Sequence, residues 1–271
     1  MINTVPAASV AGMIFSLLIA FGLPITLFIL CRKRLNAARL PALIGVLTFT
    51  VAVLLLESGA HSLLRPLTSS PAVQGSVLLT ALYGGVMAAL FEEFGRLAAM
   101  KLFMKKTLTK ENALMFGVGH GGIEAVLVVG ILYISNLATS IMINTGSIGA
   151  ALGTLDEAAR AATLESLSAL WTTDAYLFFM PGVERISAIA LHICLSYLVY
   201  RALRYGEKRC FFAALGLHFA VDAAAVLLAG SIPLPALELI LLAAMAVVVW
   251  LVSRLYRAEA SPAPDAGSAP V

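Results

Sequence analysis

Long apolar runs, separated by short polar connections, repeat along most of the chain. Seven of them are predicted to cross a membrane, at residues 10–30, 40–56, 77–102, 113–135, 183–203, 211–230 and 236–252. Their length, about twenty residues, is what a helix needs to span the hydrocarbon core of a bilayer. Because lipid offers the backbone no hydrogen-bond partner, such runs must be helical. The pattern therefore predicts an all-α polytopic membrane helix bundle with about seven transmembrane helices.

Composition agrees with this interpretation, because 61% of the 271 residues are hydrophobic and only 12% are charged. In a soluble domain about a quarter of the residues are normally charged. A net charge of +3 would be a weak indication of nucleic-acid binding in a soluble protein, but here the positions of the charges matter more than their sum. We therefore expect the lipid bilayer to surround the chain, and we expect no nucleic-acid partner.

The basic residues fall on alternate connections between the predicted helices. Fourteen of the 18 Lys and Arg residues lie at or after the ends of the first, third, fifth and seventh helices. The opposite connections hold only Arg65 and Arg160. Because cytoplasmic loops are enriched in Lys and Arg, we predict an N-terminus outside and a C-terminus inside, in a multi-pass protein of the cell membrane.

One connection, residues 136–181, is much longer than the others and is predicted to face the outside. Its first part, 136–153, is compatible with an extension of the fourth helix or with a re-entrant loop. Thr154 and Glu157 have the spacing of a capping box and predict a further helix that runs to about Trp171. Residues 1–257 are expected to form one transmembrane domain, and the Ala-, Pro- and Ser-rich residues 258–271 a disordered cytoplasmic tail.

Ionisable residues occur inside four consecutive predicted helices. Each costs roughly 2.5–3.5 kcal/mol in lipid even on a lenient insertion scale, so their presence indicates a functional site. They are Glu92, Glu93 and Arg96 in the third helix, His120 and Glu124 in the fourth, Glu184, Arg185 and His192 in the fifth, and His218 and Asp222 in the sixth. The first, second and seventh helices are expected to contribute almost nothing of this kind beyond Glu57, at the outer end of the second.

Depth in the membrane brings these residues together. Counted from the cytoplasmic helix ends at about 1.5 Å per residue, the glutamate pair and three histidines lie roughly 12–18 Å deep. We therefore expect Glu92 or Glu93 to share one cavity, open toward the cytoplasmic side, with the histidines His120, His192 and His218. Glu184 is eight residues nearer the outside than His192 and is expected in another layer or at the outer mouth.

The spacing within the helices is compatible with two chemistries. His120 and Glu124 share a helix face at i, i+4, and so do His218 and Asp222. Each pair suits two zinc ligands, or one ligand and the acid that orients it. The same groups suit a carboxylate that activates water beside a histidine that stabilises an oxyanion. A single buried histidine is more often a hydrogen-bonding link between helices, but three at one depth favour a site.

Four motifs occur in order along the third to sixth helices. They are Phe91-Glu92-Glu93-Phe94-Gly95-Arg96, Gly119-His120-Gly121-Gly122-Ile123-Glu124, Glu184-Arg185 with His192, and His218-Phe219-Ala220-Val221-Asp222. Together they resemble the YhfC family of intramembrane metalloproteases, a distant branch of the CPBP group that includes the CAAX-processing endopeptidases and the PrsW proteases. Two features depart from the CAAX pattern: the arginine follows the second glutamate by three residues instead of four, and His192 is an additional histidine.

The resemblance implies a peptidase that hydrolyses peptide bonds of membrane proteins or lipid-linked peptides near the cytoplasmic leaflet. Glu92 or Glu93, with Arg96 as charge partner, is expected to activate water. A divalent metal, expected to be zinc, is assigned to His120, His192, His218 and Asp222, and Glu124, Glu184 and Arg185 are expected to support these groups. Two alternatives remain, a proton-coupled membrane transporter and a catalytically silent membrane scaffold, because buried ionisable groups also serve proton relays and helix packing.

Overall fold

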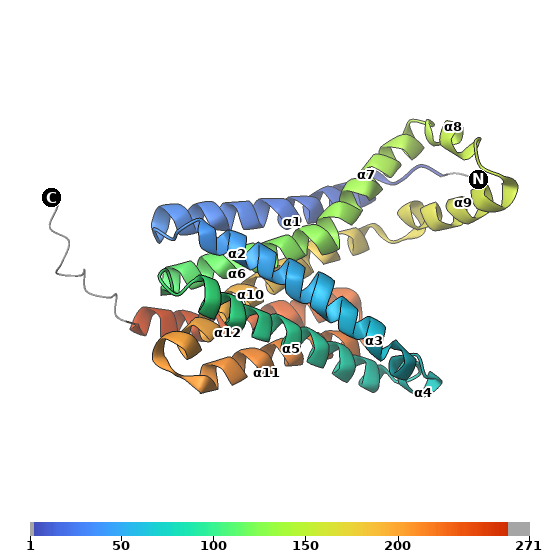
Figure 1. Ribbon diagram of the computed structural model, residues 1–271. Helices are drawn as coiled ribbons and strands as arrows, with labels where there is room; N and C mark the ends of the chain where they lie inside the picture. Colours follow the sequence, from blue (N-terminus) through green and yellow to red (C-terminus); the bar gives the residue numbers. More distant parts are fainter. Residues whose placement is uncertain (1–2, 260–271) are drawn as a thin grey trace.

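The computed structural model describes residues 3–259, and this part of the chain consists of helices and short connections (Figure 1). Within it, seven helical segments are long and apolar enough to cross a membrane. Four spans are single helices: α1 (Ala7–Arg34), α5 (Val77–Phe103), α11 (Lys208–Leu228) and α12 (Leu234–Ala258). The second span, Leu40–Thr68, joins α2 (Leu40–Phe49), η1 (Thr50–Glu57) and α3 (Ser58–Thr68), and the fourth, Lys110–Asn144, joins α6 (Lys110–Ala125), η2 (Val126–Gly130) and α7 (Ile131–Asn144). The fifth, Ala175–Tyr205, joins η3 (Ala175–Phe178) and α10 (Met180–Tyr205). The connecting helices are α4 (Pro71–Gln74), α8 (Ile148–Leu152) and α9 (Glu157–Thr172). The predicted all-α bundle with seven spans is therefore confirmed.

The second and fourth spans each contain a stretch of π-helix, η1 and η2. Such wider turns inside α-helices occur frequently at functional sites. The second span continues beyond η1 through α3, so it ends at Thr68 and not at residue 56 as predicted. The last residue of η1, Glu57, is buried and pairs with His61 of α3 at 3.2 Å.

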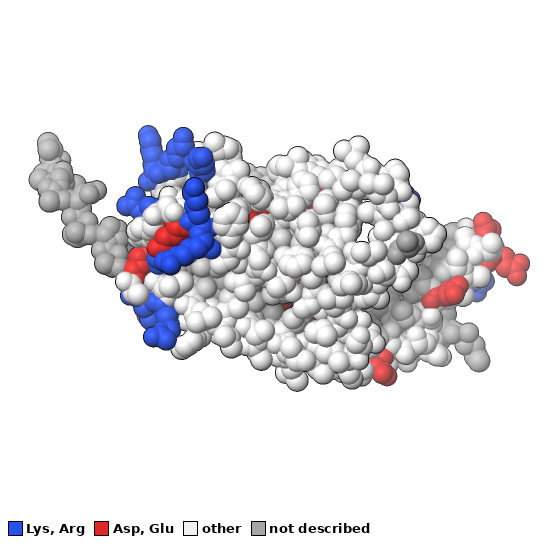
Figure 2. All heavy atoms as spheres, turned by 90° about the horizontal axis from the view of Figure 1, so that it is seen from below, with Lys and Arg blue, Asp and Glu red and all other residues white. Residues whose placement is uncertain are grey.

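Lys and Arg side chains gather at one end of the molecule, at the left of Figure 2, and the middle of the face shown is nearly free of charge. We call this the basic end; it holds the last turns of α1, α5, α10 and α12. The helix α1 begins at the opposite end, whereas α12 finishes at the basic end (Figure 1). We propose that the basic end is cytoplasmic, because Lys and Arg are retained on that side of a membrane.

Backbone contacts hold α6 firmly between α2 and α10, the two helices with which it packs most extensively. Gly45 of α2 and Gly119 of α6 lie directly against backbone atoms of the partner helix, where a Cβ atom has no room. On the other side, a Cβ on Gly117 would lie 2.6 Å from the Cα of Ile193 in α10. Small residues thus allow three helices to approach closely, as is typical of membrane bundles. The contact fixes the position of His120, which α6 carries.

The long connection at the opposite end is largely helical. The helix α7 continues to Asn144, so the first part of residues 136–153 extends the fourth span, and α8 follows it. The predicted further helix is present as α9, but its N-cap is Asp156, whose side chain accepts a hydrogen bond of 2.8 Å from the Ala159 backbone. The capping role predicted for Thr154 is wrong, because its hydroxyl donates instead to the Ala151 carbonyl.

The predicted tail, residues 258–271, is described only for its first two residues. Ala258 is the last residue of α12, and the Glu259 carboxylate accepts hydrogen bonds of 2.8 and 2.7 Å from the hydroxyls of Tyr197 and Tyr200. The Glu259 carbonyl also accepts a 2.7 Å hydrogen bond from Lys110. Order therefore extends two residues past the predicted boundary, and residues 260–271 lie outside the described part of the chain.

The proposed orientation can be tested with a reporter enzyme that is active only outside the cytoplasm. Fused after Arg257, the reporter is expected to be inactive, because positive charge keeps this end of the bundle inside. Inserted at Gly153, between α8 and α9, the same reporter is expected to be active and serves as the control. Enzymatic activity is measured in intact cells. Activity after Arg257 with silence at Gly153 would reverse the orientation.

Gly45→Ala is expected to destabilise the bundle by about 1–3 kcal/mol, the usual range for overpacking, because its methyl group pushes α2 away from α6. Gly22→Ala in α1 is the matched control, since a Cβ there meets nothing within 4 Å. Better helix propensity should make that change neutral or stabilising by up to about 1 kcal/mol. The measurement is the apparent melting temperature in detergent. A Gly45→Ala protein that melts with the wild type would show that the contact is not needed.

Candidate functional site

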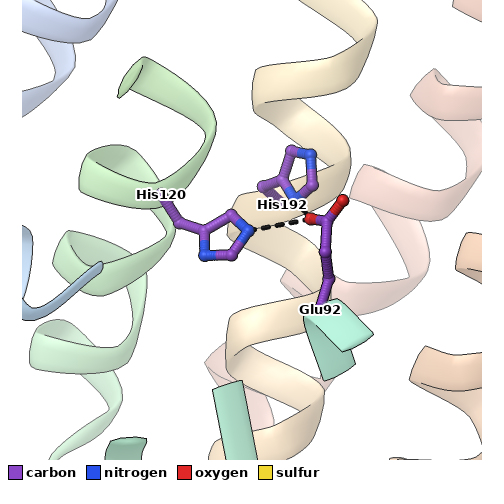
Figure 3. A group of neighbouring side chains, drawn as sticks. All are labelled: Glu92, His120 and His192. Atoms are coloured by element: carbon purple, nitrogen blue, oxygen red, sulfur yellow. Dashed lines mark hydrogen bonds and ion pairs between the residues drawn. The ribbon is translucent and has the colours of Figure 1, made fainter. Parts of the chain in front are cut away.

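Side chains from three helices point toward one another in the middle of the bundle: Glu92 of α5, His120 of α6 and His192 of α10 (Figure 3). Nε2 of His120 lies 2.9 Å from Oε2 of Glu92, and Nδ1 of His192 lies 3.8 Å from the same oxygen. All three side chains are buried, and one donor atom from each lies within 4.8 Å of the others. A carboxylate and two imidazoles are therefore within reach of a single small ligand.

The fourth helix, α11, contributes His218 from the other side of the Glu92 carboxylate. Nε2 of His218 lies 3.8 Å from Oε1 of Glu92 and 3.4 Å from Oδ2 of Asp222. Its other ring nitrogen, Nδ1, lies 2.8 Å from Oε1 of Glu93. The two consecutive acids of α5 therefore have different partners. Glu92 lies among three histidines, and Glu93 contacts Nδ1 of one of them, His218.

Arg96 links α5 to α10 next to this group of side chains. Both Arg96 and Glu93 are completely buried. Its Nε lies 3.2 Å from Oε2 of Glu93. Its Nη1 donates hydrogen bonds to the backbone oxygen of His192 at 2.8 Å and to the hydroxyl of Ser196 at 2.6 Å, and its Nη2 lies 3.0 Å from Nδ1 of His192. One guanidinium therefore balances Glu93 and fixes the orientation of His192.

A second ion-pair group continues from His192 toward the opposite end. Nε2 of His192 lies 2.5 Å from Oε2 of Glu124, and Arg185 donates a 2.7 Å hydrogen bond to the other oxygen of that carboxylate. Arg185 is also paired with its neighbour Glu184. The three residues predicted to support the site are therefore present beside it, and Glu124 is the one that contacts a histidine directly.

A cavity of about 150 Å³ lies beside these groups, between α10, α11 and α12. Its ionisable lining consists of Glu92, Glu124, Glu184, Arg185, His192, His218, Asp222 and Glu238. Among the residues predicted for the site, Glu93, Arg96 and His120 are packed behind this lining. All of the predicted residues therefore lie in one region of the structure. Most of them line the cavity, and the other three pack against the residues that line it.

The cavity extends away from the basic end, because Glu184 and Glu238 lie near the beginnings of α10 and α12. Toward the basic end, a packed apolar cluster that includes Met100, Met104 and Phe116 fills the bundle. We predicted an opening toward the cytoplasmic side, whereas the lining of the cavity extends toward the end of the bundle opposite the basic end. Glu184 lines the same cavity, near the beginning of α10, and does not lie in a separate layer.

A larger hollow of about 300 Å³ lies between α1, α2 and α6. Every residue that lines it is apolar, including Phe21, Phe28 and Val118. It offers no group that can bind a metal, move a proton or orient a polar substrate. The smaller cavity beside Glu92 is therefore the candidate site.

Two residues of this region were missed in the sequence. Glu238 lies within a predicted span, and the cost of a carboxylate in lipid should have singled it out as it did the others. Ser196 carries no charge, and its partner Arg96 is 100 residues away in the chain. No feature of the sequence around Ser196 distinguishes it from a packing residue.

The donor atoms of Glu92, His120 and His192 fit a divalent metal, because imidazole nitrogen and carboxylate oxygen both bind zinc and three protein ligands leave one position open. This group differs from the predicted ligands, since it includes Glu92 and leaves out His218 and Asp222. Nδ1 of His120 is buried without a hydrogen-bond partner in the described chain. His192 would have to exchange one of its contacts, with Arg96 or with Glu124, in order to bind an ion.

Arg96→Gln is expected to destabilise the fold by about 3–5 kcal/mol, because Glu93 is then left buried without its charge partner. Adding Glu93→Gln removes the second charge and should recover much of the loss. Arg65→Gln, at an exposed arginine, is the control and should have no effect. Apparent melting temperatures and the monomeric fraction in detergent give the comparison. A double variant no more stable than Arg96→Gln alone would show that the two charges do not stabilise each other.

Comparison with known proteins agrees with the resemblance seen in the motifs. The family model described as YhfC intramembrane metalloprotease matches residues 17–252, a range that includes all four helices of the site. The Bacillus subtilis (strain 168) protein named "Uncharacterized membrane protein YhfC" is 37% identical over 210 residues, which cover 77% of this chain and 81% of that protein. No solved structure matches the chain. The chain is therefore a multi-pass membrane protein that belongs to the YhfC family.

Proposed function

We propose that this chain is an intramembrane metallopeptidase that hydrolyses peptide bonds of membrane proteins or lipid-linked peptides. The observation that carries the proposal is the surroundings of Glu92, a buried carboxylate with three histidines at 2.9, 3.8 and 3.8 Å beside a cavity. The description of the family as intramembrane metalloproteases supports it. A structural role alone would need one partner for the carboxylate, not three imidazoles and an adjoining space.

The residues that would hold a metal are Glu92, His120 and His192, and zinc is the ion that such a nitrogen and oxygen set favours. A divalent ion bound there would lower the pKa of a coordinated water molecule and polarise the carbonyl of the substrate. The close approach of α6 to α2 and α10 keeps His120 and His192 in place. Rigid support of this kind is what a site needs in order to hold its ligands in a productive geometry.

His218 is the residue best placed to move a proton. Its Nδ1 is held by Glu93, which fixes the tautomer, so that its Nε2 faces the cavity between Glu92 and Asp222. Nε2 can accept a proton from water and return it to the amine that leaves when the peptide bond breaks. Glu93 does not line the cavity, and we assign it the positioning of His218 in place of the activation of water.

Access to the cavity supports a substrate that comes from the bilayer. The helices α11 and α12 each pack extensively on α10 but only slightly on one another. A hydrophobic segment can therefore approach the cavity between α11 and α12 without crossing the apolar cluster at the basic end. Buried carboxylates and imidazoles also exist in proton-coupled transporters, so the experiment has to separate cleavage from transport.

Glu92→Gln is expected to reduce cleavage by about 100-fold or more, because the amide neither replaces the charge at the centre of the site nor binds the metal well. The assay uses purified protein in liposomes with a pool of synthetic single-span peptides that carry a fluorophore and a quencher. Glu57→Gln is the matched control, since Glu57 is also a buried membrane glutamate but does not line the cavity. Its cleavage rate should equal that of the wild type.

Metal content provides a second measurement on the same proteins. The wild type should contain about one divalent ion per chain, and His120→Ala should lose it, whereas His218→Ala should keep the ion and lose cleavage. Cleavage by Glu92→Gln at the wild-type rate would refute the peptidase proposal. Loss of the ion from His218→Ala but not from His120→Ala would contradict the assignment of ligands.

A further inference from the structure

Glu238 of α12 lies in the lining of the cavity but takes no part in the ion-pair groups around it. Its side chain is buried, with 5% of the residue exposed, and its Oε2 has no hydrogen-bond partner among residues 3–259. The hydroxyl of Ser187, from α10, lines the same cavity and is likewise buried without a partner in the described chain. Two unpartnered oxygens of different helices therefore face one space.

The other acids of the lining all have partners. Glu92 is paired with His120, Glu124 and Glu184 with Arg185, and Asp222 with His218. A buried polar group without a partner is costly, and an unpaired carboxylate at membrane depth is more so. A bound cation that donates a hydrogen bond to Glu238 would remove this free-energy cost.

The cavity beside Glu238 also holds Glu92, so a cation bound there would share one space with the candidate site. Glu238, Leu241 and Met245 follow one face of α12 along the cavity. From Glu238 to Met245 the helix rises about 10 Å, at roughly 1.5 Å per residue. Because an extended peptide advances about 3.3 Å per residue, this stretch of the cavity wall has the length of about three residues of substrate.

We propose that Glu238 binds a primary ammonium group of the substrate. The proposal rests on the proposed function, since it takes the cavity as the binding site of a peptide. An ammonium suits the site better than a guanidinium, because its three donors can turn toward oxygens on different helices, the Glu238 carboxylate and the Ser187 hydroxyl, whereas a guanidinium needs acceptors in one plane. The cavity volume of about 150 Å³ also favours the more compact cation.

The binding step can be tested without any cleavage, with n-hexylamine as the probe and 1-hexanol as its uncharged equivalent. At ten times its Kd, hexylamine should raise the melting temperature of the detergent-purified wild type by about 3–6 °C more than hexanol does. The difference should vanish in Glu238→Gln, which keeps the size of the side chain, and persist in Glu238→Asp, which keeps its charge. Glu57→Gln should respond as the wild type does.

Two outcomes of this measurement would overturn the proposal. One is an equal effect of hexylamine and hexanol on the wild type. The other is a Glu238→Gln protein that retains the preference for the amine. Glu92→Gln should still bind hexylamine although it has lost cleavage. A wild-type protein that binds the amine but cleaves no peptide would refute the proposed function and leave the ammonium site intact.

Two sources of the ammonium, a lysine side chain and a peptide N-terminus, are separated in the cleavage assay. One pair of quenched peptides differs by acetylation of the N-terminus, and a second pair differs by lysine or norleucine. Loss of the relevant amine should raise KM about tenfold with kcat nearly unchanged, as expected when one ground-state contact is removed. The same increase is expected for Glu238→Gln with the amine-bearing peptide. If KM changes in neither pair, the amine is not recognised and the proposal is wrong.

Discussion

Two adjacent carboxylates at membrane depth impose the constraint on which the site depends. An ionised acid in lipid is stable only when cations or hydrogen-bond donors surround it, and Glu92 and Glu93 place two such acids on one turn of α5. The chain meets this demand in two ways. Glu93 is completely enclosed, with Arg96 and His218 as partners, whereas Glu92 is surrounded by imidazoles and left at the edge of a cavity. The enclosed acid supports the bundle, and the other is available for chemistry.

Close helix packing converts that electrostatic demand into a defined geometry. Gly45, Gly117 and Gly119 allow α6 to touch α2 and α10 through backbone atoms, and these contacts fix the height of His120 relative to His192. Arg96 then ties α5 to α10 through the backbone oxygen of His192. Because each imidazole is held by a different helix, a shift of any one helix would move a nitrogen away from Glu92. The same contacts between helices therefore determine both the stability of the bundle and the geometry of the site.

Much of this arrangement follows from the sequence, because the cost of a charge in lipid makes ionisable residues conspicuous in apolar runs. The seven spans and the convergence of Glu92 with three histidines were predicted from run length and depth. The contacts of His192 with Glu124 and Arg96 were not predicted, because they depend on the rotation of α10 about its axis, which no spacing rule provides. Thr154 was named as the cap from its spacing to Glu157, but Asp156, two residues later, offers a similar oxygen, and only the backbone decides between them. Glu238 was overlooked, although the same reasoning applies to it.

The direction of the cavity is where the structure departs most from the sequence analysis, and the difference has a physical cause. Counting residues along each helix gives the distance of a group from the helix end. It does not show on which side of that group apolar side chains fill the space between the helices. Large apolar side chains such as Met100 and Phe116 fill it toward the basic end, whereas acids line it toward the other end. A basic cytoplasmic end would therefore place the entrance toward the outer leaflet. Lysines are scarce on that side of membrane proteins, which makes an unpaired carboxylate at Glu238 a selective contact for the rare substrate that brings an amine there.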